Sequence, residues 1–149
     1  MKIGRLCAIA AIALVALLSG CASVPMADTK LDAAAKTFAA PAGKAGVYVY
    51  RNETFGAAVK MDVFLDGKRL GDTVARSYFY AEVEPGTHAV MGKSENESEV
   101  RFHALAGKLY FIWQEVKMGL LYARNELKLV DEAVGRAGVT ESNRIEVVK

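Results

Sequence analysis

The chain has 149 residues, of which 24% are charged and 52% are hydrophobic, and its formal net charge is +2. Without residues 1–20, it carries 17 basic and 17 acidic residues. Such a balanced chain lacks the basic field that attracts nucleic acid, so we expect no nucleic-acid partner.

The first 20 residues have the pattern of a secretory signal peptide. Lys2 and Arg5 precede an uncharged run from Leu6 to Leu18, and small residues follow at the expected cut site. The run is shorter than the ~20 apolar residues that a transmembrane helix needs. It ends in Leu18-Ser19-Gly20-Cys21, which resembles a bacterial lipobox, a motif whose cysteine takes a diacylglycerol and becomes the mature N-terminus. The alternative is an ordinary secretory signal that leaves Cys21 unmodified.

We expect Cys21 to be the lipidated residue and to hold the protein to a membrane of the bacterial cell envelope. Stable anchoring needs more than one membrane signal, and two or three acyl chains on one residue meet that need. The next residue is Ala22, not the aspartate that resembles an inner-membrane retention signal, so the outer membrane facing the periplasm is favoured. Cys7 lies in the signal peptide, so no thiol remains for a disulfide.

Residues 21–44 differ in composition from the rest of the mature chain. They are rich in Ala and poor in large apolar side chains. This composition predicts an Ala-rich tether with a short helix around Leu31–Phe38. Residues 45–149 are then expected to form a single folded domain.

The folded part begins with two expected strands and a tight turn. Val47–Tyr50 is β-branched or aromatic throughout, and residues 59–65 carry apolar side chains at every second position, as strands do. Asp66-Gly67 follows, and this dipeptide between two strands predicts a hairpin with a type I′ turn. Pairing across such a turn places Leu70 opposite Val63.

A second hairpin is expected from Tyr78–Val83 through the turn Glu84-Pro85-Gly86 to Thr87–Met91. Residues 99–104 alternate again. Leu109–Val116 is apolar at nearly every position, which indicates a strand buried on both faces.

The C-terminal part completes the predicted fold. Leu121, Leu127 and Leu129 share one face of a further strand. A helix is expected over Asp131–Gly138 with Asp131 as its N-cap, and Ile145–Lys149 forms an edge strand or a loose tail. Together these elements predict a mainly β protein: an antiparallel β-sandwich of about seven or eight strands with one short C-terminal helix.

Two resemblances to known families support this fold. Val63-Phe-Leu-Asp-Gly-Lys-Arg-Leu-Gly71, followed by Val83-Glu-Pro-Gly-Thr-His88, resembles a PEGA-type or carboxypeptidase-regulatory-like β-sandwich, a binding or spacer module of bacterial surface proteins. More of the chain, from Cys21 to Ala133, resembles a family of small proteobacterial lipoproteins known as domain of unknown function 2846. That resemblance implies a lipid-anchored β domain and brings no catalytic residue. It is carried by Gly107-Lys-Leu-Tyr110, Lys117-Met-Gly119 and Ala123-Arg124.

The aromatic residues offer the best candidate site. Tyr48 and Tyr50 share one face of a strand, as do Tyr78 and Tyr80. On an exposed sheet face with Arg51, Arg76 or Arg124, they would form a rigid platform for a glycan or a peptide, because Tyr and Arg are favoured at binding surfaces. The other interpretation is that most of them fill the core or its rim, with hydroxyls at the surface.

Three polar groups could in principle bind a metal or act as acid and base, but turns and charged strand edges account for them. The chain also lacks a nucleophile elbow, a P-loop and a dinucleotide fingerprint. We therefore expect no enzymatic activity, no metal and no cofactor. The three groups are His88 with His103, Glu95 with Glu97 and Glu99, and Asp62 with Asp66 and Asp72.

The sequence thus predicts a non-enzymatic envelope lipoprotein whose β-sandwich binds or braces a partner at the periplasmic face of the membrane. A protein partner is expected to bind an exposed strand edge or the aromatic face. The alternative is a module that binds peptidoglycan or another glycan through the aromatic face.

Overall fold

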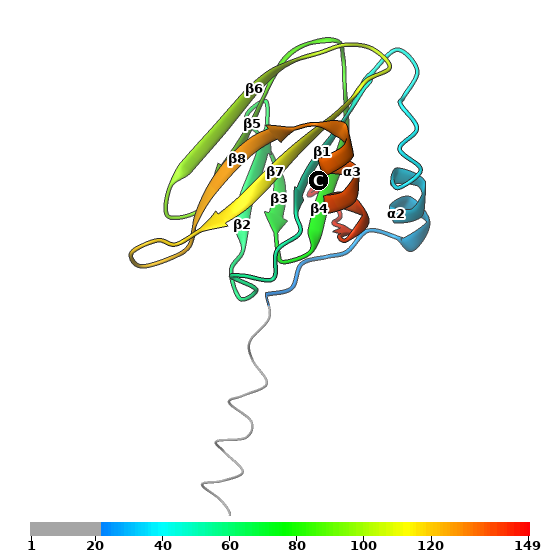
Figure 1. Ribbon diagram of the computed structural model, residues 1–149. Helices are drawn as coiled ribbons and strands as arrows, with labels where there is room; N and C mark the ends of the chain where they lie inside the picture. Colours follow the sequence, from blue (N-terminus) through cyan, green and yellow to red (C-terminus); the bar gives the residue numbers. More distant parts are fainter. Residues whose placement is uncertain (1–21) are drawn as a thin grey trace, which may run out of the picture.

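A computed structural model describes residues 22–149, so Cys21 and the signal peptide lie outside the described residues. Within this range, two β-sheets lie face to face, and two helices cover the outer face of the larger sheet (Figure 1). None of the described helices is long and apolar enough to cross a membrane. The helices are α2 (Thr29–Ala35) and α3 (Glu132–Thr140). The strands are β1 (Ala45–Arg51), β2 (Met61–Leu65), β3 (Lys68–Thr73), β4 (Ser77–Val83), β5 (Gly86–Lys93), β6 (Glu97–Ala104), β7 (Leu109–Lys117), β8 (Arg124–Val130) and β9 (Asn143–Arg144).

The strand order is β8-β7-β1-β4-β9 in the larger sheet and β3-β2-β5-β6 in the smaller one. The nine strands of the described residues confirm the predicted mainly β sandwich, with slightly more strands than expected. Two neighbouring pairs, β1 with β7 and β4 with β9, are parallel. Alternation along a strand does not encode the direction of its partner, and the long stretches of chain between these strands supply the crossovers that parallel pairs need.

The apolar faces of the two sheets meet in one core. Val47, Val63, Phe79 and Ile112 in this core each retain at most 1% exposure. Strand β7 also buries its opposite face beneath the helices, where Phe111 is 1% exposed. This confirms the predicted burial of β7 on both faces.

The predicted hairpin between β2 and β3 is present. Asp66 and Gly67 have φ angles of 51° and 77°, as a type I′ turn requires. The register shifts by one residue within the hairpin, so Val63 lies opposite Gly71 and the predicted pairing with Leu70 is wrong. A β-bulge explains the shift, because it inserts one extra residue into β3. Leu70 nevertheless remains in the core, with 5% exposure.

The prediction of a second hairpin is wrong. Strand β4 pairs with β1 along all of Ala45–Arg51, whereas β5 pairs with β2 and β6 in the other sheet. The turn Glu84-Pro85-Gly86 therefore carries the chain from one sheet to the other, and Gly86 accommodates the positive φ of 145° there. The same turn residues suit a hairpin or a crossover, so only the tertiary pairing distinguishes them.

Side chains close the sandwich along β6 and β8. Asn96 Oδ1 accepts a hydrogen bond from the Asn125 backbone N–H at 2.8 Å, and Ser98 Oγ accepts one from Leu127 at 2.9 Å. These bonds satisfy donors of β8 that have no neighbouring strand. On the opposite side, between β3 and β4, the C-terminal segment follows β9, and the Val148 backbone N–H donates to the Leu70 carbonyl at 2.9 Å. A groove lies beside this segment.

Strand β8 begins at Arg124, later than predicted, and residues 118–123 form the loop of the β7–β8 hairpin. Leu121 therefore lies in this loop, not on the strand with Leu127. The apolar residues before Arg124 satisfied the alternating pattern without forming part of the sheet.

Helix α3 begins after its predicted N-cap, Asp131, whose carboxylate accepts a backbone N–H of the first turn at 3.0 Å. The helix lies directly on the larger sheet because glycines face that sheet. A Cβ atom on Gly135 would overlap the Phe111 side chain, and one on Gly138 would overlap the Tyr50 ring.

The expected tether is a packed segment in the structure. We call residues 22–40 the N-terminal strap, which contains α2 and follows the domain surface to the side of α3 (Figure 1). Met26 forms a β-bridge with Ile145, and Ala35 is 6% exposed against the aromatic face. Composition was misleading here because small Ala side chains suit a flexible coil and also permit a helix to pack closely on a sheet.

Candidate functional site

The aromatic face predicted from the sequence exists, but the helices cover it. Tyr48, Tyr50 and Tyr78 are 1%, 2% and 0% exposed beneath α2 and α3. Tyr80 is partly buried beside Tyr48, with ring centroids 4.8 Å apart. Arg76 is exposed in the turn before β4. The three covered tyrosines are core residues and do not form an exposed platform.

Two of the three covered tyrosines bind the strap through their hydroxyls. Tyr48 Oη donates to the Ala35 carbonyl at 2.7 Å, and Tyr78 Oη donates to Asp32 Oδ1 at 2.8 Å. Burial raises the pKa of both hydroxyls above its ordinary value, and the neighbouring carboxylate contributes at Tyr78. Both hydroxyls therefore stay protonated and act as structural donors.

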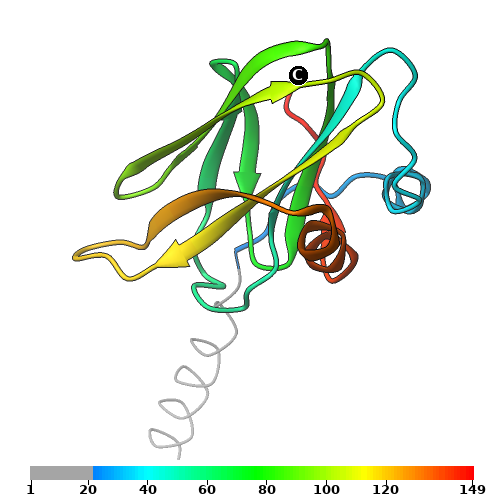
Figure 2. The same cartoon turned by 45° about the horizontal axis from the view of Figure 1, so that its top comes forward.

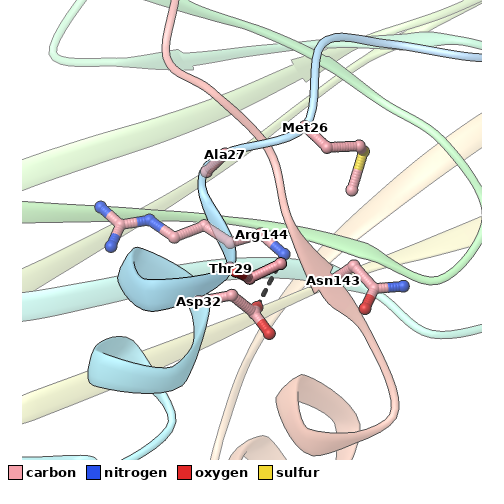
Figure 3. A pocket seen from close by; sticks show the side chains of 6 residues that line it. All are labelled: Met26, Ala27, Thr29, Asp32, Asn143 and Arg144. Atoms are coloured by element: carbon pink, nitrogen blue, oxygen red, sulfur yellow. Dashed lines mark hydrogen bonds between the residues drawn. The ribbon is translucent and has the colours of Figure 1, made fainter.

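A small pocket lies where the strap meets β9 (Figure 3). Its acidic group, Asp32, accepts hydrogen bonds from the Arg144 backbone N–H at 2.9 Å, from Lys36 at 2.8 Å and from Tyr78. Burial alone would raise the pKa of Asp32, but these bonds outweigh it and lower the pKa. The carboxylate thus joins the strap to β4 and β9. The lining residues are Met26, Ala27, Thr29, Asp32, Asn143 and Arg144.

His88 connects the two turns that resemble the β-sandwich module. Its Nδ1 lies 2.6 Å from Asp66 Oδ2, and its Nε2 lies 2.7 Å from the Glu84 carbonyl oxygen. Burial lowers the pKa of the imidazole, but the carboxylate and the carbonyl raise it, and the net shift is upward. His88 therefore has a structural role that fastens the β2–β3 turn to the crossover between the sheets.

A groove of about 460 Å³ lies beside His88, between β3 and β4. We call it the β3–β4 groove. Its volume falls in the range of ligand sites, and it combines apolar walls with a few polar groups, as such sites do. The walls are Leu65, Leu70, Val83 and Val147, and the polar groups are Asp66, Lys68, Glu82, Glu84 and His88.

Of the other polar candidates, Asp62 and Asp72 lie opposite each other on β2 and β3, and the remaining groups lie apart. Among residues 22–149, no group of three or more His, Cys, Asp or Glu side chains is placed to hold a metal ion. Asp62 and Asp72 both contact the Arg69 guanidinium at 2.6 Å, and His103 is exposed on β6. The three glutamates diverge, since Glu95 binds the β7–β8 loop while the other two pair with basic residues of β5 and β6.

The most exposed apolar surface among residues 22–149 was not predicted from the sequence. It consists of two neighbouring loops, residues 52–60 and 118–123, with a shallow groove between them. The run of apolar residues after Lys117 was a usable signal, but the alternating pattern assigned Leu121 to a strand. We call this surface the apolar tip, and its members are Phe55 (54% exposed), Met118 (78%), Leu120 (93%), Leu121 (97%) and Tyr122 (47%).

Fold and surface together define a two-sheet β-sandwich with a helical cover and an open groove. The chain matches a family model described as "Protein of unknown function (DUF2846)" over residues 41–125. It is also 35% identical over 129 residues to an "Uncharacterized protein" of Haemophilus influenzae, a match that covers 85% of this chain and 77% of that protein. The chain therefore belongs to the DUF2846 family, as the resemblance predicted. The family model covers less of the chain than the predicted span from Cys21 to Ala133.

Proposed function

We propose that the protein is a non-enzymatic lipoprotein of the bacterial envelope, anchored through Cys21 in the outer membrane and facing the periplasm. Its β-sandwich binds or braces a protein partner there. The observation that carries the proposal is the lipobox-like sequence Leu18-Ser19-Gly20-Cys21 after an uncharged run. A thioether-linked diacylglycerol at that cysteine supplies two acyl chains, which suffice for a stable anchor.

The β3–β4 groove supports the binding part of this proposal. It lies beside the edge strand β3, whose Leu70 carbonyl already accepts a backbone hydrogen bond from Val148. A segment of a partner would therefore bind through the apolar walls and polar groups of the groove. The alternative of a glycan-binding aromatic face has weaker support, because Tyr48, Tyr50 and Tyr78 are covered.

The anchor is tested by replacing Cys21 with Ser. We expect the wild-type protein to enter the detergent phase of a two-phase partition, and the Cys21→Ser protein to remain in the aqueous phase. Cys7→Ser is the matched control and should behave like the wild type, because Cys7 lies in the signal segment. Recovery of the wild type in the aqueous phase, with an unacylated amino terminus by mass spectrometry, would overturn the anchor.

The partner is tested by photo-crosslinking in intact cells. A photoreactive side chain at Lys68, in the β3–β4 groove, should give a protein adduct of defined mass. The same side chain at Lys108, an exposed position in the β6–β7 loop, is the control and should not give that adduct. Identical adducts at both positions would argue against the groove, and sedimentation of the purified protein with peptidoglycan would favour the glycan alternative.

A further inference from the structure

The two loops of the apolar tip are held in place by charged side chains beneath them. In the β7–β8 loop, the Glu95 carboxylate accepts the backbone N–H groups of Leu120, Leu121 and Tyr122 at 3.0, 2.7 and 2.9 Å. These three donors lower the pKa of Glu95 to about 2. A side chain at Gly119 would overlap the Tyr122 carbonyl, so the loop is tightly turned. This geometry leaves Leu120 and Leu121 almost wholly exposed.

In the second loop, residues 52–60, a buried cation binds backbone carbonyls, whereas in the first loop a carboxylate binds backbone N–H groups. Arg51 is fully buried, and its guanidinium donates to the carbonyls of Val59, Phe55 and Gly56 at 2.8, 3.3 and 2.5 Å. The Tyr122 hydroxyl donates to a carbonyl of this loop, that of residue 60, at 3.3 Å. Several backbone polar groups of both loops are thus satisfied within the protein. These internal hydrogen bonds lower the free-energy cost of moving the loops out of water, because unsatisfied backbone groups are costly there.

The start of the described chain lies beside the apolar tip. The Ala22 backbone N–H donates to the Ala57 carbonyl at 3.1 Å, in the loop that carries Phe55. Ala22 follows Cys21 directly in the sequence. Both views place the first described residues and the β7–β8 loop on the same side of the sandwich, away from the β6–β7 loop (Figure 2).

We propose that the apolar tip inserts into the interfacial region of the membrane that holds the lipid anchor, and so orients the domain on the bilayer. This inference rests on the proposed anchoring of Cys21. The occupant is a lipid surface because the acylated residue adjoins the tip, and because the tip combines exposed Leu and Met with the aromatic Phe55 and Tyr122. Aromatic side chains are favoured at membrane interfaces.

Most of the charges around the tip are paired, and Lys60 in the 52–60 loop is an exposed cation. Lys117 contacts Glu115 and Glu126 at 2.8 and 3.3 Å, and Arg124 lies 3.8 Å from Glu95. This rim is close to neutral, so insertion is driven by burial of apolar surface and should depend little on salt or on anionic lipid.

The test uses the acylated full-length mature protein in vesicles of phosphatidylethanolamine and phosphatidylglycerol. Leu120→Cys carries a nitrobenzoxadiazole label in the tip, and Leu105→Cys carries it in the β6–β7 loop, at the other end of β7. The two positions are matched, since both are exposed leucines in loops. If Cys21 is acylated, the introduced cysteine is the one free thiol of the mature chain.

We expect an acyl-chain doxyl quencher to reduce the emission of the label several-fold more at position 120 than at position 105, at low and high salt alike. Equal, weak quenching at both positions in protein that floats with the vesicles would overturn the tip proposal alone. Failure of both variants to float would overturn the anchor and this proposal with it. Weak quenching in vesicles combined with protection of position 120 from maleimide in cells would assign the tip to a protein partner.

Discussion

At the residue scale, the His88–Asp66 pair makes the stability of the domain depend on pH. The folded-state pKa of His88 is raised above its usual value, so the stabilisation is fully present below about pH 6.5, the usual pKa, and is lost as the pH rises through the folded-state pKa. Protonated His88 can donate from both ring nitrogens, to Asp66 and to the Glu84 carbonyl. We expect His88→Gln to cost about 1 kcal/mol at pH 5.5 and less at pH 8.5.

Urea unfolding at the two pH values measures this difference, and NMR titration of the imidazole measures its pKa directly. His103→Gln on the exposed face of β6 is the matched control and should leave the unfolding free energy unchanged. A His88→Gln protein whose loss of stability does not vary with pH would contradict the proposed role of the pair.

At the element scale, the contact between α3 and the larger sheet depends on two glycines. Gly→Ala in a helix interior normally gains about 1 kcal/mol from helix propensity. At Gly138 the added methyl would overlap the buried Tyr50 ring, and overpacking of this kind costs about 1–3 kcal/mol or more. We therefore expect Gly138→Ala to lower the free energy of unfolding in urea, against its helix propensity.

Val134→Ala, on the exposed side of α3 where Val134 is 50% exposed, is the control and should change stability by less than about 0.5 kcal/mol. Stabilisation by Gly138→Ala would show that the helix does not lie directly on the sheet.

At the scale of the whole molecule, the two candidate surfaces lie towards opposite ends. Strand β2 begins at Met61, beside the loop of the apolar tip, and ends at the Asp66 turn, which borders the β3–β4 groove. A domain whose tip lies on the membrane would direct this groove towards the periplasm. The same arrangement would give the proposed anchor and the proposed partner site separate surfaces, so each could be altered without changing the other.

Local sequence patterns predicted the elements more reliably than their partners. Asp66-Gly67 fixed a turn and Asp131 fixed a helix start, because both effects act within a few residues. The assignment of β4 and β5 to one hairpin failed, since the choice of sheet depends on which distant strand completes each edge. The aromatic face was predicted with correct side-chain directions on the strands. Its covering by α2 was missed, because Ala-rich sequence does not reveal what it packs against.

The strap has a consequence for how far the domain can move. A flexible coil over residues 21–44 would allow a root-mean-square distance of roughly 25 Å between the domain and its point of attachment. Instead, Ala22 donates a hydrogen bond to Ala57, and Met26 forms a β-bridge with Ile145. Helix α2 accepts a hydrogen bond from the Tyr48 hydroxyl. If Cys21 is anchored, the next residue, Ala22, already contacts the domain. The domain would then stay at the bilayer surface, and a partner would have to bind it there.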